Sequence, residues 1–184
     1  QNRGTMEIIF IDVGQGDSIL IKSPHGHFIL VDGGGSQFYE VGEMKLLPYL
    51  RHRGINHLDL VINTHPDSDH FLGLTEIMNR ITVERFAYPL VLHDSPEYVE
   101  AFRLVQQHSG SLLGLHAGQV LQVEPGFHLE VLHPSPEISR VADTNHLSLV
   151  LKCRYQNFSA LLMGDLDREG LEELAARKSG VQCD

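Results

Sequence analysis

The stretch that decides the fold is His65-Pro66-Asp67-Ser68-Asp69-His70. Its six residues include four side chains that can bind a metal ion. It follows Leu58–Asn63, a continuous apolar run of the kind expected for a strand buried on both faces. Ligand sites in such sheets lie beyond the carboxyl ends of the strands. Because imidazole and carboxylate together suit zinc, manganese or iron, the stretch predicts a metal site.

A plainer interpretation is a polar turn in which Ser68 or Asp69 caps the following helix. A cap accounts for one of these residues and leaves the others unexplained, so we favour the metal site. In a tight turn, His65 and Asp67 would face one position while Asp69 and His70 reach a second. Such a turn could hold up to two ions about 3.5–4 Å apart, as in two-metal hydrolytic sites.

Outward from this stretch, short apolar runs alternate with turn signals, and four segments show helical spacing. We expect strands at Met6–Asp12, Ser18–Lys22, Phe28–Asp32, Leu58–Asn63, Val120–Val123, His128–Leu132, Leu147–Tyr155 and Phe158–Met163. We expect helices at Glu43–Arg53, Phe71–Arg80, Pro96 to about Gly110, and Arg168–Lys178. Strand groups at both ends with helices between them indicate sheets covered by helices, either α/β or α+β.

Size and composition indicate one globular domain. The chain has 184 residues, 42% hydrophobic and 21% charged, which excludes a disordered or fibrous protein. No apolar run approaches the roughly 20 residues that cross a bilayer, so we expect a soluble domain without membrane insertion. Residues 1–5 are expected to be a linker and residues 6–184 the domain. Cys153 is expected in the core, and nothing supports a disulfide with Cys183.

The net charge of −10, from 24 acidic and 14 basic residues, disfavours a broad surface for gripping nucleic-acid phosphates. The nearest candidates for a basic track are few: Lys45, Arg51, Arg53 and Arg80. A phosphate substrate is still compatible with this charge, because bound divalent cations would reverse the field at a carboxylate-rich site.

The motif His65-x-Asp67-x-Asp69-His70 resembles the metal motif of the metallo-β-lactamase superfamily, in the variant with aspartate in place of the second histidine. The segment 11–18 resembles the opening of the C-terminal hydrolase domain of ComEC-type competence proteins, membrane channels for DNA uptake. Segments 46–50, 53–55, 144–150 and 162–165 match that family too, so the resemblance runs from about Met6 to Leu171. It implies an α+β fold, the αβ/βα sandwich of two mixed β-sheets flanked by helices.

The resemblance also implies a role for particular side chains. Asp32 would brace the metal loop by hydrogen bonds, supported by Asn145, and Asp67 and Asp69 would be catalytic. Asp165 matches the carboxylate that bridges two metals, although an aspartate after a strand is more often a helix cap. The implied metal ligands are His65, Asp67, Asp69, His70 and Asp165, with zinc or manganese as the metal.

Three further features are less determined by the resemblance. His146 stands where the ComEC-type pattern tends to carry asparagine, so it is either a ligand or the neighbour of one. His133 is expected to be a loop residue. Asp12, Gln15 and Asp17 are expected to form a tight turn near the metals, possible substrate contacts, because Gly14 and Gly16 permit the backbone conformations that such a turn needs.

The superfamily pattern ends with a further strand and a late histidine, whereas no histidine follows His146. We therefore expect a fold that is incomplete at its C-terminus, with a weakened second metal position.

Three functions are compatible with these observations. The first is a metal-dependent phosphodiesterase or nuclease acting on DNA, placed by the resemblance on the extracytoplasmic side of a membrane channel. The second is a non-catalytic docking or gating module of that channel. The third is a hydrolase of another phosphoester or ester, because one fold serves many chemistries.

Overall fold

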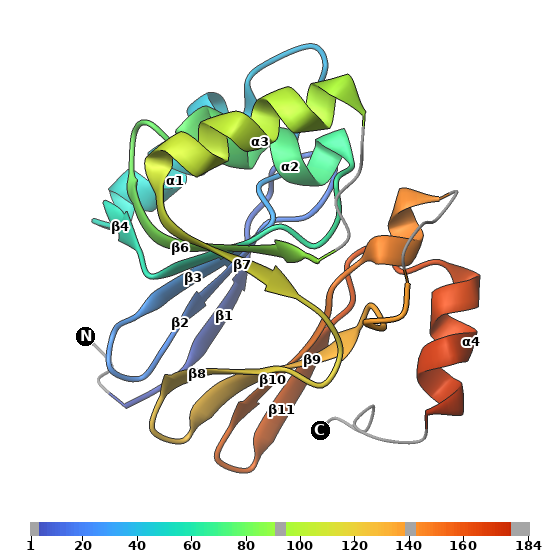
Figure 1. The fold of residues 1–184 in the computed structure, drawn as a ribbon. Helices are drawn as coiled ribbons and strands as arrows, with labels where there is room; N and C mark the ends of the chain where they lie inside the picture. Colours follow the sequence, from blue (N-terminus) through green and yellow to red (C-terminus); the bar gives the residue numbers. More distant parts are fainter. Residues whose placement is uncertain (1–3, 91–94, 139–142, 178–184) are drawn as a thin grey trace.

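The structure is a computed structural model that describes residues 4–90, 95–138 and 143–177. Its elements form four layers (Figure 1): three helices, a first sheet, a second sheet, and a last helix on the outer side of the second sheet. The expected sandwich is confirmed. Residues 1–3 of the expected linker, Lys178 of the last expected helix, and Cys183 lie outside the described residues.

The first sheet is mixed and has seven strands. β1, β2 and β3 form an antiparallel meander, and β3 then pairs in parallel with β5. β5 is followed across the sheet by β6, which also pairs in parallel with β4 and β7. The strands are β1 Glu7–Phe10, β2 Ile19–Lys22, β3 Phe28–Val31, β4 His57–Leu58, β5 Leu60–Ile62, β6 Thr82–Pro89 and β7 Ser109–Leu115.

The second sheet has four strands in the order β11-β10-β9-β8. All of its pairings are antiparallel, so only the first sheet is mixed, whereas two mixed sheets were expected. β8 with β9 and β10 with β11 are joined by tight turns, and antiparallel pairings need no crossover helix, so the one α-helix described in this half, α4, follows the last strand. The strands are β8 Val120–Glu124, β9 Phe127–His133, β10 Val150–Tyr155 and β11 Phe158–Leu162.

The helices cover the two outer faces (Figure 1). The π-helical segment η1 Gly42–Leu46, α1 Leu47–His52, α2 Ser68–Ile77 and α3 Pro96–His108 lie over the first sheet. The short 3-10 helix η2 Thr144–Leu147 and α4 Arg168–Ala176 belong to the second sheet's side. Among the described residues, no helix is both long and apolar enough to span a membrane.

The central strands are buried on both faces, as the continuous apolar runs predict. In β3, Leu30 packs under the helices while Ile29 and Val31 face the second sheet. In β5, Val61 packs under the helices and Leu60 faces the second sheet. Cys153 is fully buried between the sheets, which confirms its predicted core position. A third, smaller apolar cluster joins α4 to the outer face of the second sheet.

Strands β6 and β7 were not predicted, and the helix expected to reach Gly110 ends at His108. β6 carries charged residues among its apolar ones, so it lacks the continuous run that marks β5. Gly110 lies in β7 against β6, where an added Cβ would be 2.4 Å from the backbone oxygen of Glu84. This glycine therefore marks a close strand pairing rather than the end of a helix.

Candidate metal centre

The centre forms where two adjacent parallel strands end. Asp32 directly follows β3, and His65 lies three residues beyond the end of β5. Asp32 has a left-handed backbone conformation, with φ of 56°, which non-glycine residues adopt rarely and mostly where surrounding structure imposes it. These strand ends place Asp32 beneath the His65–His70 stretch.

Asp32 is the buried brace of this stretch, with 1% of its surface exposed. Its carboxylate accepts hydrogen bonds from the Thr64 backbone N–H at 2.8 Å, from Thr64 Oγ1 at 2.6 Å and from His70 Nδ1 at 2.9 Å. The hydrogen bonds predicted for Asp32 are therefore present. Because an ionised carboxylate only accepts, His70 carries a proton on Nδ1 and can present the lone pair of Nε2.

His65 is oriented by the same network through Thr64. Thr64 Oγ1 donates to Asp32 and lies 2.9 Å from His65 Nδ1, so its remaining lone pair accepts the Nδ1 proton. The Nε2 atoms of His65 and His70 are both buried without a hydrogen-bond partner, and the two rings lie 4.2 Å apart. Unpaired buried polar atoms are costly, and two converging imidazole nitrogens fit a divalent metal ion.

Carboxylates surround these two nitrogens. Asp165 Oδ1 is 3.4 Å from His70 Nε2, and Asp17, His70 and Asp165 offer ligand atoms within 4.8 Å of one another. Asp67 Oδ2 is 3.8 Å from His65 Nε2. The predicted ligands His65, Asp67, His70 and Asp165 thus lie together, and Asp17 joins them from the first glycine loop.

Capping does not explain these carboxylates. Asp67, rather than Ser68 or Asp69, occupies the N-cap position of α2, and its side chain makes no capping hydrogen bond. It accepts instead from Thr144 Oγ1 of η2. The cap of α4 is Asp167, which accepts from the Gly170 backbone N–H, so Asp165 is not needed as a helix cap.

Among the described residues, Asp69 belongs to no ligand group with His65 or His70. Its Oδ2 accepts a hydrogen bond of 3.3 Å from Gln15 Nε2 in the predicted glycine turn. Gly16, at φ of 74°, lies so close that an added Cβ would be 1.6 Å from the backbone oxygen of Asp69. Asp12 is exposed and accepts from the Gly14 N–H. The turn therefore packs directly on the metal stretch, as expected.

The electrostatic field of this site favours positive charge. Burial disfavours the imidazolium of His70, but the hydrogen bond and charge of Asp32, with Asp165 and Asp69, outweigh burial and raise the pKa of His70 to about 9. Burial, followed by the neighbouring His70, lowers the pKa of His65. The site thus favours a positive charge on His70 and opposes a second one on His65. A single metal cation bound between the two rings fits this pattern.

The structure places His146 and His133 in a second group. His146 Nδ1 is 2.9 Å from Asp167 Oδ1, and its ring packs edge-on against that of His133. Among the described residues, His146 joins no ligand group with His65 or His70. The expectation that His133 is a loop residue is wrong, because it ends β9 and is fully buried. Asn145 Oδ1 is buried and has no hydrogen-bond partner in the structure.

An open cleft of about 650 Å³ borders the centre. Among the described residues, its lining includes four carboxylates and neither lysine nor arginine: Pro66, Asp67, Ser68, Asp69, Leu72, Ser95, Glu97, Tyr98, Asp143 and Thr144. Three of the four predicted basic residues form ion pairs elsewhere: Lys45 with Asp12, Arg53 with Glu7, and Arg80 with Glu43. The cleft beside the metal stretch is therefore acidic, and those three cations provide no basic track into it.

Sequence reasoning missed two hydroxyl groups of the site. Thr64 links Asp32 to His65, and its position directly before the metal stretch was the available signal. Thr144 contacts Asp67 across the two halves of the chain, and nothing in its local sequence indicates that contact.

Comparison with known proteins agrees with this architecture. The chain is similar to ComE operon protein 3 of Bacillus subtilis, with 32% identity over 97% of the chain and 24% of that protein. It is also similar to Recombination protein 2 of Haemophilus influenzae, with 31% identity over 97% of the chain and 20% of that protein. The chain thus spans about a quarter or less of the length of these relatives.

Solved structures show the same fold. The subclass B3 metallo-beta-lactamase MEM-A1, from a soil metagenome library, superposes with a TM-score of 0.60 at 13% identity, covering all of this chain and 76% of that one. The diiron beta-hydroxylase CmlA of Streptomyces venezuelae gives a TM-score of 0.57 at 16% identity, covering 97% of this chain and 34% of that one. Residues 11–183 match the family description itself, and the chain belongs to the metallo-beta-lactamase superfamily.

Proposed function

We propose that this domain is a metal-dependent phosphodiesterase that cleaves DNA strands as part of a larger competence protein. The superfamily is generally metal-dependent and hydrolytic. The observation that carries the proposal is the pair of buried, unpartnered Nε2 atoms of His65 and His70 beside an open cleft, with Asp17 and Asp165 offering ligand atoms near His70. Similarity to competence proteins supports DNA as the substrate. We place the domain on the extracytoplasmic side of the cell membrane as part of the same proposal.

The proposed ligands are His65, His70, Asp67 and Asp165, with Asp17 at the rim. Divalent ions bound there, zinc or manganese, would polarise a phosphoryl oxygen and lower the pKa of water. Asp69 is held by Gln15, so we assign it to positioning the glycine turn rather than to a metal. His146 is assigned to the second histidine group.

Within this scheme Asp67 orients the attacking water. Its Oδ1 is occupied by the Thr144 hydroxyl, whereas Oδ2 faces His65 and the centre. Asp67 therefore has one oxygen, Oδ2, directed at the centre, and as a ligand there it would orient the attacking water in one defined geometry. Asp32 maintains the Nδ1 protons of the site and does not contact substrate.

The test is cleavage of single-stranded DNA by the purified chain, with manganese or zinc added, followed by metal analysis. We expect Asp67→Asn to lower the cleavage rate by roughly 100-fold or more, since loss of a side chain that handles the reacting proton costs at least about that much. Glu137→Gln, an exposed carboxylate outside the cleft, is the matched control and should leave the rate unchanged. Equal rates for Asp67→Asn and the wild type would exclude the assigned centre.

A second candidate is hydrolysis of a small ester. It is favoured by the four carboxylates in the described lining of the cleft, because they repel a long polyanion more than a small or cationic substrate. Turnover of bis(4-nitrophenyl) phosphate without cleavage of DNA would favour this candidate. A chain that binds metal but turns over neither substrate would favour the docking or gating module.

A further inference from the structure

We propose that His133, His146 and Glu173 form a second, structural zinc site that fastens α4 to the second sheet. The three residues come from β9, η2 and α4, respectively. Each offers one ligand atom, and these atoms all lie within 4.8 Å of one another. The group shares no residue with the centre proposed for hydrolysis, and its role is independent of that function.

Hydrogen bonds prepare both imidazoles to bind a metal through Nε2. His133 Nδ1 is 3.0 Å from the backbone oxygen of Ser148, and His146 Nδ1 is 2.9 Å from Asp167 Oδ1. Both partners can only accept, so in each ring the proton is on Nδ1 and the lone pair is on Nε2. Metal-binding histidines are oriented in this manner, by a carbonyl or carboxylate on the opposite nitrogen.

A bound metal ion would satisfy a buried polar atom that otherwise has no partner. His133 is fully buried, and its Nε2 has no hydrogen-bond partner in the structure. The ring of His146 meets it edge-on with centroids 5.6 Å apart. A buried nitrogen without a partner costs stability, and an ion between the two rings would satisfy it.

Glu173 supplies the negative charge. Its Oε1 lies 3.7 Å from His146 Nε2, while Oε2 lies 3.9 Å from Arg177 on the same helix. Ligand atoms of a tetrahedral zinc ion with bonds near 2.0–2.1 Å are separated by about 3.3 Å, so the His146–Glu173 pair needs only a small closure and the other pairs must close from within 4.8 Å. Two histidines and one glutamate, with water as the fourth ligand, is a coordination set typical of zinc.

At this position, a bound ion would hold α4 against the second sheet. α4 stands on the outer side of the second sheet (Figure 1). Among the described residues, the apolar cluster that attaches it has three buried members, Val150, Leu166 and Leu174, and three partly buried ones. An ion held by three separate elements would add a cross-link where the apolar contact is small. It would also restrain η2, whose Thr144 contacts Asp67.

The experiment is equilibrium dialysis of the whole chain against zinc, with bound zinc counted per chain. Glu173→Gln removes the charged ligand from a half-exposed position, so the chain is expected to fold, which circular dichroism would check. We expect this variant to bind one zinc fewer than the wild type, or to bind that zinc at least 10-fold more weakly. His146→Asn should have the same effect.

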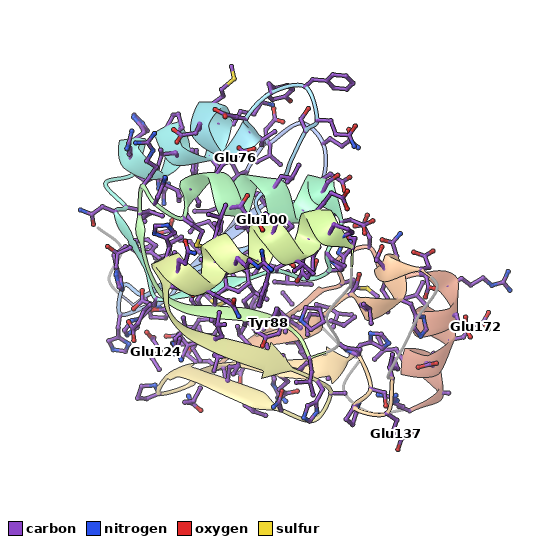
Figure 2. The ribbon with its side chains drawn as sticks, turned by 45° about the horizontal axis from the view of Figure 1, so that its top comes forward. Glu76, Tyr88, Glu100, Glu124, Glu137 and Glu172 are labelled. Carbon is purple, nitrogen blue, oxygen red and sulfur yellow. The ribbon has the colours of Figure 1, made fainter. Side chains whose placement is uncertain are left out.

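The matched control is Glu172→Gln on the same helix. Glu172 lies at the outer edge of the molecule (Figure 2), 68% exposed and paired with Arg168, so its replacement should leave zinc binding unchanged. Added zinc should also raise the melting temperature of the wild type and of Glu172→Gln more than that of Glu173→Gln. Equal zinc content and affinity in the wild type, Glu173→Gln and His146→Asn would overturn the proposal.

Discussion

The protein contains two histidine pairs that follow one design on different sheets. In both pairs, His65 with His70 and His133 with His146, each Nδ1 lies within hydrogen-bonding distance of an oxygen atom. The first pair is oriented by one buried carboxylate, Asp32, directly for His70 and through a hydroxyl for His65. The second pair uses a backbone carbonyl for one ring and a half-buried carboxylate for the other.

Because different groups orient the two histidine pairs, we expect the pairs to differ in their sensitivity to a single substitution. Removing the carboxylate of Asp32 affects both rings and the backbone of the metal stretch at once. No side-chain substitution removes the carbonyl that orients His133, and the partner of His146 is partly solvated. We therefore expect the first pair to be fragile and the second to be tolerant, and the predictions test this difference.

The largest effect is expected from Asp32→Ala. The change leaves the buried Thr64 N–H and the His70 Nδ1 proton without their acceptor, and breaking such a buried charged network costs about 3–5 kcal/mol. Urea unfolding would measure the loss, and metal analysis should show an empty first centre. Asp12→Ala, at a side chain 95% exposed, is the control and should stay within about 0.5 kcal/mol of the wild type.

A smaller effect is expected from Thr64→Val. Valine keeps the shape but removes the hydroxyl that donates to Asp32 and accepts from His65 Nδ1. One buried donor is left unpaired, so unfolding should become easier by about 1–3 kcal/mol. Thr82→Val, at an exposed position of β6, provides the comparison in the same urea titration. Equal stability of these two variants would show that the hydroxyl link is not needed to orient His65.

The second pair should respond to Asp167 in two separable ways. Asp167 also caps α4, so Asp167→Ala should cost about 1 kcal/mol of stability. Asp167→Asn keeps a capping side chain and should remain within about 0.5 kcal/mol, because asparagine caps as well as aspartate. Zinc binding at the second pair should weaken about 10-fold in both variants, since both lose the charged acceptor of His146. Unchanged binding in Asp167→Asn would show that charge on this acceptor is not required.

The smallest effect is expected for the pair of His25 and Glu124, which lies outside both histidine groups. Burial tends to raise the pKa of Glu124, but hydrogen bonds from Ser23 and His25 outweigh it and hold the pKa below its ordinary value of 4.5. A group with a depressed pKa stabilises the fold above the unfolded pKa, and that contribution is lost as the pH falls through the folded pKa. We expect the contribution of Glu124 to the free energy of unfolding to be about 1 kcal/mol or less.

Urea unfolding of the wild type and of Glu124→Gln at pH 6 and at progressively lower pH would measure this contribution. The two curves should differ near pH 6 and converge in acid. Glu100→Gln, at an exposed glutamate of α3, should run parallel to the wild type throughout. A difference between the wild type and Glu124→Gln that grows in acid would reverse the assigned sign.

The sequence predicted the first metal centre because the residues that indicate it lie close together in the chain. His65, Asp67 and His70 lie within six residues after a buried apolar strand, and strand ends concentrate ligand sites. Asp32 and Asp165 came from the resemblance, since an isolated aspartate after a strand is equally typical of a turn or a cap. The positions of most strands followed from apolar periodicity and the sandwich of two sheets from the resemblance, while β6 and β7 were missed because their apolar pattern is interrupted.

The sequence by itself therefore determined the superfamily and the position of the His65–His70 stretch, and the two-sheet sandwich followed from the family resemblance. Tertiary structure alone decided which side chains meet: Asp69 with Gln15, Asp67 with Thr144, and His146 with Glu173 rather than with His65. The physical reason is that short-range patterns report strands, turns and nearby ligands. Contacts between residues tens of positions apart depend on how the two sheets and α4 pack against one another.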